Sequence, residues 1–179
     1  MVRPSSRERV IDSALRAFAT AGEDVTLDAV ARIAGITKQG VLYHFADKRE
    51  LRAGMLDAVL ARWELHMGVA VAGPLDAASV GERIRAYARV SARGDVVPGE
   101  AALFAQVLAR PDESTPYAEW VRRLFAAPDA ASTRDAARLN TAWLAANSLW
   151  SVLVNGKRRL TDDEVDGVLG MIDELTQGL

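Results

Sequence analysis

The sequence predicts an all-α protein of about nine helices. Apolar residues recur at intervals of three and four along most of the 179 residues, which is the helical period. No stretch alternates apolar and polar residues as a strand does, and no segment repeats another. Glycine, proline and helix-capping residues separate the periodic segments. These observations together indicate a fold built from helices alone.

The first helix is expected from about Ser6 to Ala21, where an apolar stripe ends at Gly22. Two short helices follow over residues 27–34 and 38–44, with Gly35 at the corner between them. Glycine adopts the left-handed conformation that ends a helix at little cost, and threonines stand at both N-cap positions, Thr26 and Thr37. Two short helices with a tight corner make a helix-turn-helix candidate.

A long helix is expected next, because Asp47 and Glu50 have the spacing of a capping box. Its apolar residues are spaced by four: Leu51, Met55, Val59, Trp63 and Met67. Residues spaced by four gradually change face along a helix. The first half of this row can therefore pack against the N-terminal helices, and the second half against another domain. We therefore expect a DNA-binding domain over residues 1–50 and a second helical domain over residues 51–179, linked by this helix.

The remaining chain divides into further helices at its breakers. Helices are expected over about 77–92, 100–109, 117–125, 132–155 and 162–176, with loops at 94–99 and at the sequence RPDEST (110–115). The last helix opens with a capping box at Thr161 and Glu164.

Composition limits the class of protein. Half of the residues are hydrophobic and 26% are charged, an ordinary globular mixture, and the net charge is −2. The absence of cysteine excludes disulfides, thiolate metal sites and thiol catalysis. The N-terminus has no apolar signal core, and no apolar run is long enough to span a bilayer. We expect a cytoplasmic protein with no membrane partner.

The first fifty-odd residues resemble the DNA-binding domain of the TetR (tetracycline-repressor-like) family of transcriptional regulators. The matching segments are VIDSALRAFATAG (10–22) and VTLDAVARIAGITKQGVLYHFADKRELRAGML (25–56), about a third of the chain, whereas the rest matches in architecture only. The resemblance implies a homodimeric regulator that binds a pseudo-palindromic double-stranded DNA operator, and we interpret it as a repressor released by a small ligand. In many members a tyrosine stands three positions before the phenylalanine; here Tyr43 stands two before Phe45, about 100° around the helix.

The helix over 38–44 is then the recognition helix. Lys38 can donate to guanine O6 or N7, Gln39 can pair with adenine, and Gly40 leaves room for close approach of the backbone to DNA. The expected phosphate contacts are Thr26, Thr37, Tyr43, His44 and Lys48. His44 is equally consistent with packing inside the headpiece. Arg3 and Arg7 belong either to a DNA-contacting arm or to a solvated one.

The C-terminal two-thirds present a dimer surface and candidate ligand contacts. We expect the homodimer to form through the helices over 132–155 and 162–176, where Gly167 and Gly170 permit close helix approach. On the first of these helices two amides alternate with two indoles at Asn140, Trp143, Asn147 and Trp150, facing either the dimer seam or a ligand pocket. Further candidates for a cavity wall are Trp63, Met67, Tyr87, Phe104 and Trp120, which equally suit a plain core. Such a wall suits a hydrophobic or amphipathic small-molecule effector.

An enzyme is the main rival class of protein. The only histidines are His44 and His66, and there is no glycine-rich phosphate loop and no carboxylate cluster with metal-ligand spacing. We therefore expect no catalytic activity, no cofactor and no metal. The sequence is also consistent with a helical small-molecule- or protein-binding module without DNA affinity, and with a transcriptional activator of the same fold.

Overall fold

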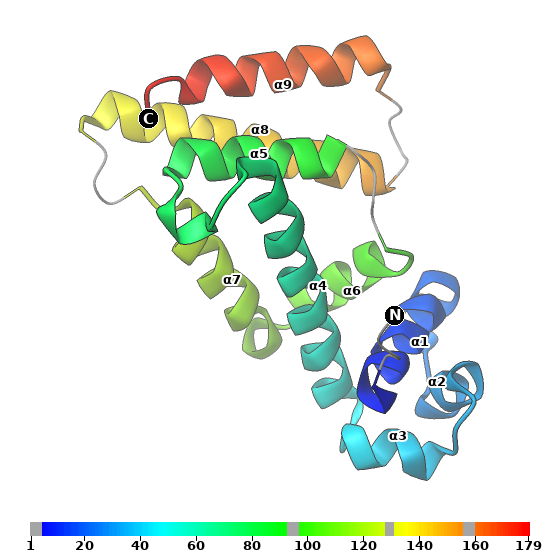
Figure 1. The fold of residues 1–179 in the computed structure, drawn as a ribbon. Coiled ribbons are helices and arrows are strands. Elements are labelled where there is room, and N and C mark those ends of the chain that lie inside the picture. Colours follow the sequence, from blue (N-terminus) through cyan, green and yellow to red (C-terminus); the bar gives the residue numbers. More distant parts are fainter. Residues whose placement is uncertain (1–4, 93–96, 128–130, 156–159) are drawn as a thin grey trace. The chain divides into compact units, whose positions relative to one another are not determined.

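The computed structural model describes residues 5–92, 97–127, 131–155 and 160–179. Within these residues the chain forms nine α-helices, two short 3-10 helices and no strand (Figure 1), which confirms the expected all-α fold. The α-helices are α1 (Ser6–Ala21), α2 (Leu27–Ala34), α3 (Lys38–His44), α4 (Lys48–Val71), α5 (Val80–Ala92), α6 (Glu100–Leu108), α7 (Pro111–Phe125), α8 (Thr133–Asn155) and α9 (Asp162–Thr176). No helix in the described ranges is long and apolar enough to cross a membrane.

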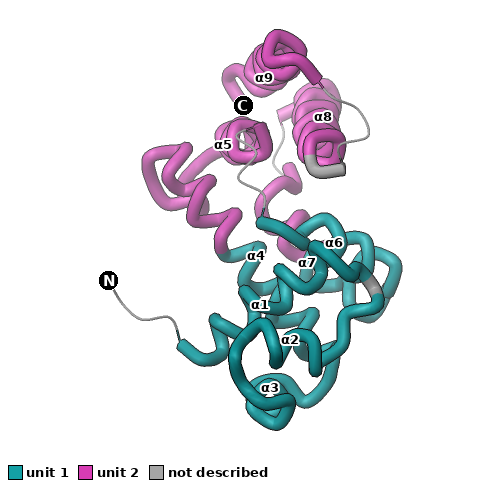
Figure 2. The backbone as a smooth tube through the Cα atoms, turned by 90° about the vertical axis from the view of Figure 1, so that its right-hand side faces the viewer, with its two compact units in different colours: residues 1–61, 97–117 teal, residues 62–96, 118–179 magenta. Residues whose placement is uncertain are grey.

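The chain groups into two compact units, coloured separately in Figure 2. The first comprises residues 1–61 and 97–117, and the second comprises residues 62–96 and 118–179. Helices α4 and α7 each contribute residues to both units. The first unit thus includes α6, which lies far beyond residue 50 in the sequence. The expected boundary at residue 50, between a DNA-binding domain and a second helical domain, stays a prediction.

In the first unit, α1 packs against α2 and α6. A reciprocal cap begins α1, because Ser5 Oγ accepts from the Glu8 N–H at 3.2 Å and the Glu8 carboxylate accepts from the Ser5 N–H at 2.7 Å. Gly99 precedes α6 at φ +89°, and a Cβ at this position would collide with the carbonyl oxygen of Leu15 in α1. Glycine at position 99 therefore lets α6 begin directly against α1.

In the second unit, α5, α8 and α9 lie side by side (Figure 1 and Figure 2). Their shared core contains fully or almost fully buried side chains at Ile84, Ala88, Ala142, Ala146, Leu149 and Ile172. The Arg85 guanidinium joins α5 to the end of α9 by donating to the Thr176 carbonyl oxygen at 3.0 Å and to its hydroxyl oxygen at 2.8 Å. Arg89 and Asp173 form an ion pair at 2.9 Å between the same two helices.

The segment RPDEST is helical over 111–115, so its interpretation as a loop was wrong. Helix α7 begins at Pro111, whose missing N–H and fixed φ suit the first helical position. Asp112 and Glu113 then place two carboxylates in the first turn, where they interact favourably with the helix dipole. Pro116 is accommodated inside the same helix.

Helix α5 begins at Val80 rather than near Ala77. Residues Leu75–Ala77 form a 3-10 helix instead. Ser79 caps α5 by accepting from the Glu82 N–H at 3.2 Å, and the Glu82 carboxylate accepts from the Ser79 N–H at 2.7 Å. The hydrogen bonds that Ser79 donates to the Glu82 carboxylate lower the pKa of Glu82 from its ordinary value.

Candidate nucleic-acid interface

The corner between α2 and α3 has the geometry that the sequence predicts. Thr26 Oγ1 accepts from the Ala29 N–H at 3.1 Å, and Thr37 Oγ1 accepts from the Gly40 N–H at 3.1 Å. Gly35 adopts the left-handed conformation, with φ 68° and ψ 33°. Both N-caps and the glycine corner are therefore confirmed, and together they fix the direction in which α3 leaves α2.

One side of this motif is buried and positions α3 on the rest of the first unit. Val30, Val41 and Phe45 are almost completely buried. A Cβ on Gly54 of α4 would lie 2.6 Å from Phe45 Cε1, so the ring rests directly on the α4 backbone. The Arg7 guanidinium stands 5.0 Å from the centroid of the same ring, a cation–π contact.

The other side of the motif carries the candidate DNA contacts. Thr26, Thr37, Lys38, Gln39 and Lys48 are exposed, and Gly40 is half-buried. The remaining two candidates are neighbours: Tyr43 is 85% exposed, whereas His44 is half-buried with its ring 5.0 Å from that of Tyr43. All eight residues therefore keep at least part of their surface exposed. Arg3 lies outside the described residues.

An ion pair links α2 to the first residue of α3. Lys38 Nζ lies 2.8 Å from Asp28 Oδ2, and both side chains are more than half exposed. No role for Asp28 was expected from the sequence. The ten-residue separation crosses the corner, so no spacing rule for a single helix indicates this pair.

The cap of α4 differs from the expected capping box by one residue. Asp47 Oδ1 accepts from the Glu50 N–H at 2.8 Å, as expected, but the Glu50 carboxylate accepts from the Ala46 N–H at 2.7 Å instead of from that of Asp47. Glu50 therefore binds the backbone of the connection that follows α3.

A second ion pair holds the start of α4 to the first turn of α7, inside the first unit. The Arg52 guanidinium donates to both carboxylate oxygens of Glu113, at 2.6 and 2.5 Å. Only 12% of the Arg52 side chain and 10% of the Glu113 side chain are exposed. These hydrogen bonds lower the pKa of Glu113 and raise that of Arg52. The sequence did not indicate this pair, whose members are 61 residues apart.

Most candidate ligand contacts gather around Tyr87 in the second unit. The ring centroid of Tyr87 lies 4.9 Å from that of Trp63 and 6.3 Å from that of Trp120, and its hydroxyl donates to Asn147 Oδ1 at 3.3 Å. Trp150 is 6.4 Å from Trp63. This set of aromatic residues is called the Tyr87 cluster below.

The other candidates divide between the two units. Trp143 reaches the Tyr87 cluster through Phe125, at 6.4 Å between ring centroids, and Met67 is completely buried in the second unit. Phe104 lies in the first unit against Tyr117, at 5.2 Å. Asn140 is exposed on α8 and is not brought together with Asn147.

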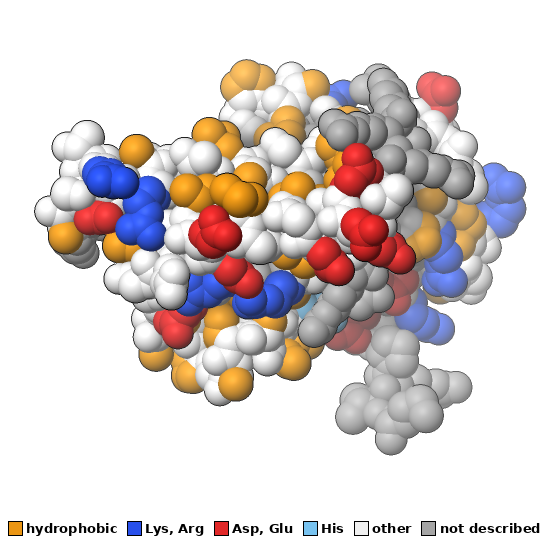
Figure 3. Space-filling model, turned by 90° about the horizontal axis from the view of Figure 1, so that it is seen from above, with side chains coloured by type: hydrophobic (Ala, Val, Ile, Leu, Met, Phe, Trp, Pro, Cys, Tyr) orange, Lys and Arg blue, Asp and Glu red, His pale blue; other side chains and the backbone are white. Residues whose placement is uncertain are grey.

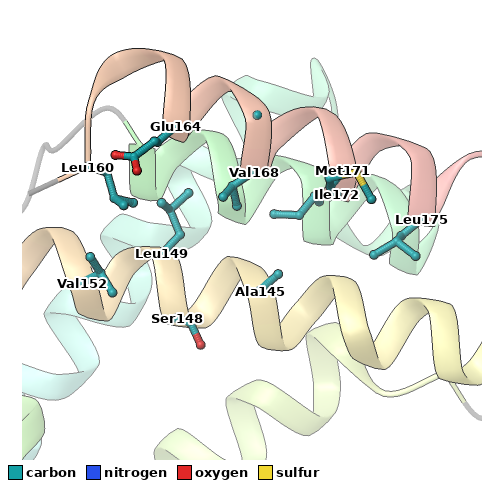
Figure 4. A pocket seen from close by; sticks show the side chains of 11 residues that line it. Ala145, Ser148, Leu149, Val152, Leu160, Glu164, Val168, Met171, Ile172 and Leu175 are labelled. Carbon is teal, nitrogen blue, oxygen red and sulfur yellow. The ribbon is translucent and has the colours of Figure 1, made fainter. Parts of the chain in front are cut away.

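An apolar groove of about 520 Å³ runs between α8 and α9 (Figure 4). Side chains from both helices point into it, including Leu149 and Val152 of α8 and Val168 and Ile172 of α9. Gly167 also lines the groove, and no atom from another part of the described structure lies within 4 Å of where its Cβ would be. Figure 3, which views α9 from above, shows apolar side chains beside acidic ones on this surface.

The family profile described as "Tetracyclin repressor-like, C-terminal domain" matches residues 81–177, more than half of the chain. The profile "Bacterial regulatory proteins, tetR family" matches residues 10–55. This chain belongs to the TetR family. It is therefore a transcriptional regulator with a helix-turn-helix DNA-binding domain, in which α2 and α3 form the helix-turn-helix.

Two curated TetR-type relatives, both from Pseudomonas putida, match the N-terminal part of the chain. Each is 47% identical to it over 57 residues: the HTH-type transcriptional regulator SrpR and the uncharacterized HTH-type transcriptional regulator TtgW. The match covers 31% of this chain, 25% of SrpR and 40% of TtgW. The chain thus matches less than half the length of either relative.

Solved TetR-family structures share the fold over nearly the whole chain. A transcriptional regulator from Rhodococcus sp. Rha1 superposes with a TM-score of 0.72 at 18% identity, covering 97% of both chains. A TetR-family regulator from Rhodococcus sp. gives a TM-score of 0.70 at 18% identity, covering 96% of this chain and 99% of the other. At this level of identity the similarity extends to the fold alone.

Proposed function

We propose that this TetR-family regulator represses transcription by binding a pseudo-palindromic operator as a homodimer, and that a small ligand releases it. The observation that carries the proposal is the capped corner of α2 and α3, which buries Val41 and Phe45 and leaves the start of α3 exposed. A helix presented in this way enters the major groove with its N-terminal residues nearest the bases.

The proposal assigns base reading to the first two residues of α3. Lys38 donates to guanine and Gln39 pairs with adenine, while Gly40 keeps the helix free of a further side chain at the DNA. The backbone of the operator contacts the N-termini of α2 and α3, at Thr26 and Thr37, where unpaired N–H groups and the helix dipole attract phosphate. Tyr43, His44 and Lys48 contribute the remaining phosphate contacts.

The proposed dimer forms through α8 and α9. Their groove is apolar. Met171, which lines it, and Leu144 of α8 each expose more than half of their surface. Apolar surface of this kind is typical of an interface between copies of a protein. Gly167 and Gly170 meet no neighbouring atom, so a second copy can approach α9 closely. Two-fold symmetry then requires an operator with two related half-sites.

The proposed effector site is the Tyr87 cluster. It combines aromatic rings with two polar groups: the Asn147 amide, bonded to Tyr87, and the Glu64 carboxylate, which accepts from the Trp120 indole N–H at 2.8 Å and pairs with Arg123. Such a lining suits a hydrophobic or amphipathic molecule with a few polar groups. The effector releases DNA if it binds the DNA-incompetent state more tightly, with α4 as the helix that shifts between the states.

A mobility-shift experiment tests DNA binding directly. The probe is DNA from immediately upstream of the gene, at two salt concentrations and with random DNA as competitor. We expect a specific shift that weakens with salt, and that is lost or strongly reduced in Lys38→Ala and Gln39→Ala. Arg122→Ala, which removes an exposed charge from α7, is the matched control. Unchanged affinity in both α3 variants would reject the assignment of the recognition helix.

Two further measurements test the oligomeric state and the competing functions. Light scattering with chromatography gives the mass of the wild type and of Gly167→Leu, which we expect to be a dimer and a monomer respectively. If the upstream probe gives no shift, a pull-down of genomic fragments shows whether the operator lies elsewhere or whether the protein does not bind DNA. Failure to retain any fragment would favour a binding module without DNA affinity.

A further inference from the structure

The Lys38–Asp28 ion pair places an acid at the centre of the proposed DNA-binding surface. Asp28 stands two residues after the proposed phosphate contact Thr26, and its carboxylate lies 2.8 Å from the ammonium group assigned to guanine. A carboxylate at this position repels phosphate and occupies Lys38 before DNA arrives. An acidic residue that only weakened DNA binding would not be expected at this position, so Asp28 calls for another explanation.

The exposure of the pair determines how it behaves. The side chains are 52% and 65% exposed, and ion pairs this exposed contribute little to stability. Lys38 can therefore leave Asp28 when it is offered a better acceptor. Guanine presents O6 and N7 in the major groove, whereas a phosphate offers one negative charge, as the Asp28 carboxylate already does, and carries no sequence information.

We propose that Asp28 is a specificity-determining residue: it holds Lys38 away from phosphates and releases it to the base edge of the correct half-site. On random DNA the Lys38–Asp28 ion pair stays intact. The pair then has no net charge, so it releases no counterion from the DNA phosphates. On the operator Lys38 exchanges the carboxylate for base acceptors. Asp28 thus lowers affinity for all DNA but lowers it least for the operator. This inference rests on the proposed DNA-binding function.

The consequence for salt dependence is quantitative. If Asp28 loses its charge, Lys38 becomes an additional cation for phosphate, and each phosphate neutralised steepens the slope of log affinity against log salt by about 0.9. When the salt concentration rises from about 50 to about 200 mM, one such contact adds about a threefold loss of affinity. The effect should appear mainly on random DNA.

The experiment uses the full chain and two duplexes of equal length. One is the sequence that the wild type recovers from a random pool, and the other is random DNA. Fluorescence anisotropy measures affinity from about 50 to about 200 mM salt for the wild type, Asp28→Asn, Asp28→Glu, Lys38→Ala and the double variant Asp28→Asn/Lys38→Ala. Asp12→Asn, which removes an exposed acid from α1, controls for net charge. Thermal unfolding by circular dichroism checks the fold, with Asp28→Ala as a second neutral variant.

We expect Asp28→Asn to bind random DNA more tightly than the wild type, with a slope steeper by about one, so that its advantage over the wild type is about threefold larger at about 50 mM than at about 200 mM salt. Affinity for the selected duplex should change less, so the ratio between the two falls. Asp28→Glu should restore the wild-type ratio, and the double variant should behave as Lys38→Ala alone. The inference would be overturned if Asp28→Asn bound both duplexes more tightly by the same factor, or if Asp12→Asn gained as much affinity for random DNA. It would also be overturned if the double variant still bound random DNA more tightly than Lys38→Ala. Recovery of no preferred duplex by the wild type would instead reject the proposed function, and this inference with it.

Discussion

The buried ion pair between Arg52 and Glu113 should be a major contributor to the stability of the first unit. The substitution Glu113→Gln keeps the shape of the side chain and removes its charge. Arg52 then stays in a site where about nine-tenths of its side chain is shielded from water, with one neutral acceptor in place of a bidentate carboxylate. The variant therefore tests the cost of leaving a buried guanidinium without its counter-charge.

The expected cost lies between two limits. Breaking a buried pair costs about 3–5 kcal/mol and breaking an exposed pair about 0–1 kcal/mol. Arg52 retains some exposure, and the glutamine oxygen can still accept one hydrogen bond. We therefore expect Glu113→Gln to lower the free energy of unfolding by about 2–3 kcal/mol.

Urea unfolding followed by circular dichroism measures this loss, at one fixed protomer concentration because the proposed dimer would contribute to apparent stability. The adjacent pair provides a matched control. Asp112 lies 4.0 Å from Arg49, and both side chains are 66% exposed. Asp112→Asn should change the free energy of unfolding by less than about 0.5 kcal/mol. If the two variants lost equal stability, burial would not govern the strength of the Arg52–Glu113 pair, and the reasoning would be refuted.

Three further predictions follow from local geometry. The pKa of Glu113 is below its ordinary value of 4.5, so its charge contributes fully to the free energy of unfolding above pH 4.5, and this contribution is lost as the pH falls through the lowered pKa. In Glu113→Gln, the free energy of unfolding should therefore decrease less steeply as the pH is lowered through this range. Gly99→Ala should destabilise by about 3 kcal/mol or more in urea, since it combines a positive φ with a backbone collision, whereas Gly73→Ala, with no atom within 4 Å, should be nearly neutral. Thr161→Ala removes the hydroxyl that accepts from the Glu164 N–H, so the melting curve should report a loss of about 1 kcal/mol. A stable Gly99→Ala or an unchanged Thr161→Ala melting curve would contradict the corresponding argument.

The sequence predicted those features whose cause is local. Thr26, Gly35 and Thr37 each act on a backbone group within three or four residues, so the limits of α2 and α3 follow from the sequence alone. The start of α7 was misread because proline, serine and acidic residues are common in loops, yet they also suit the first turn of a helix. Composition does not distinguish these two settings.

Pairings across the fold were not predicted, because they depend on how the helices pack. Nothing in the local sequence joins Asp28 to Lys38 or Arg52 to Glu113. The amides on α8 illustrate the same limit. Asn140 and Asn147 are two turns apart and share a face, but Tyr87 of α5 reaches Asn147, whereas Asn140 stays exposed.

The contact between Phe45 and Gly54 has a consequence for how α3 can move. The ring at the end of α3 rests on bare backbone of α4, and the smallest side chain added there would overlap it. Close-packed surfaces do not compress, so a displacement of the first turns of α4 cannot be absorbed at this point. Helix α3 and the start of α4 therefore move as one rigid part, so a rotation of the start of α4 also rotates α3, the proposed recognition helix, and changes the angle at which it would enter the major groove.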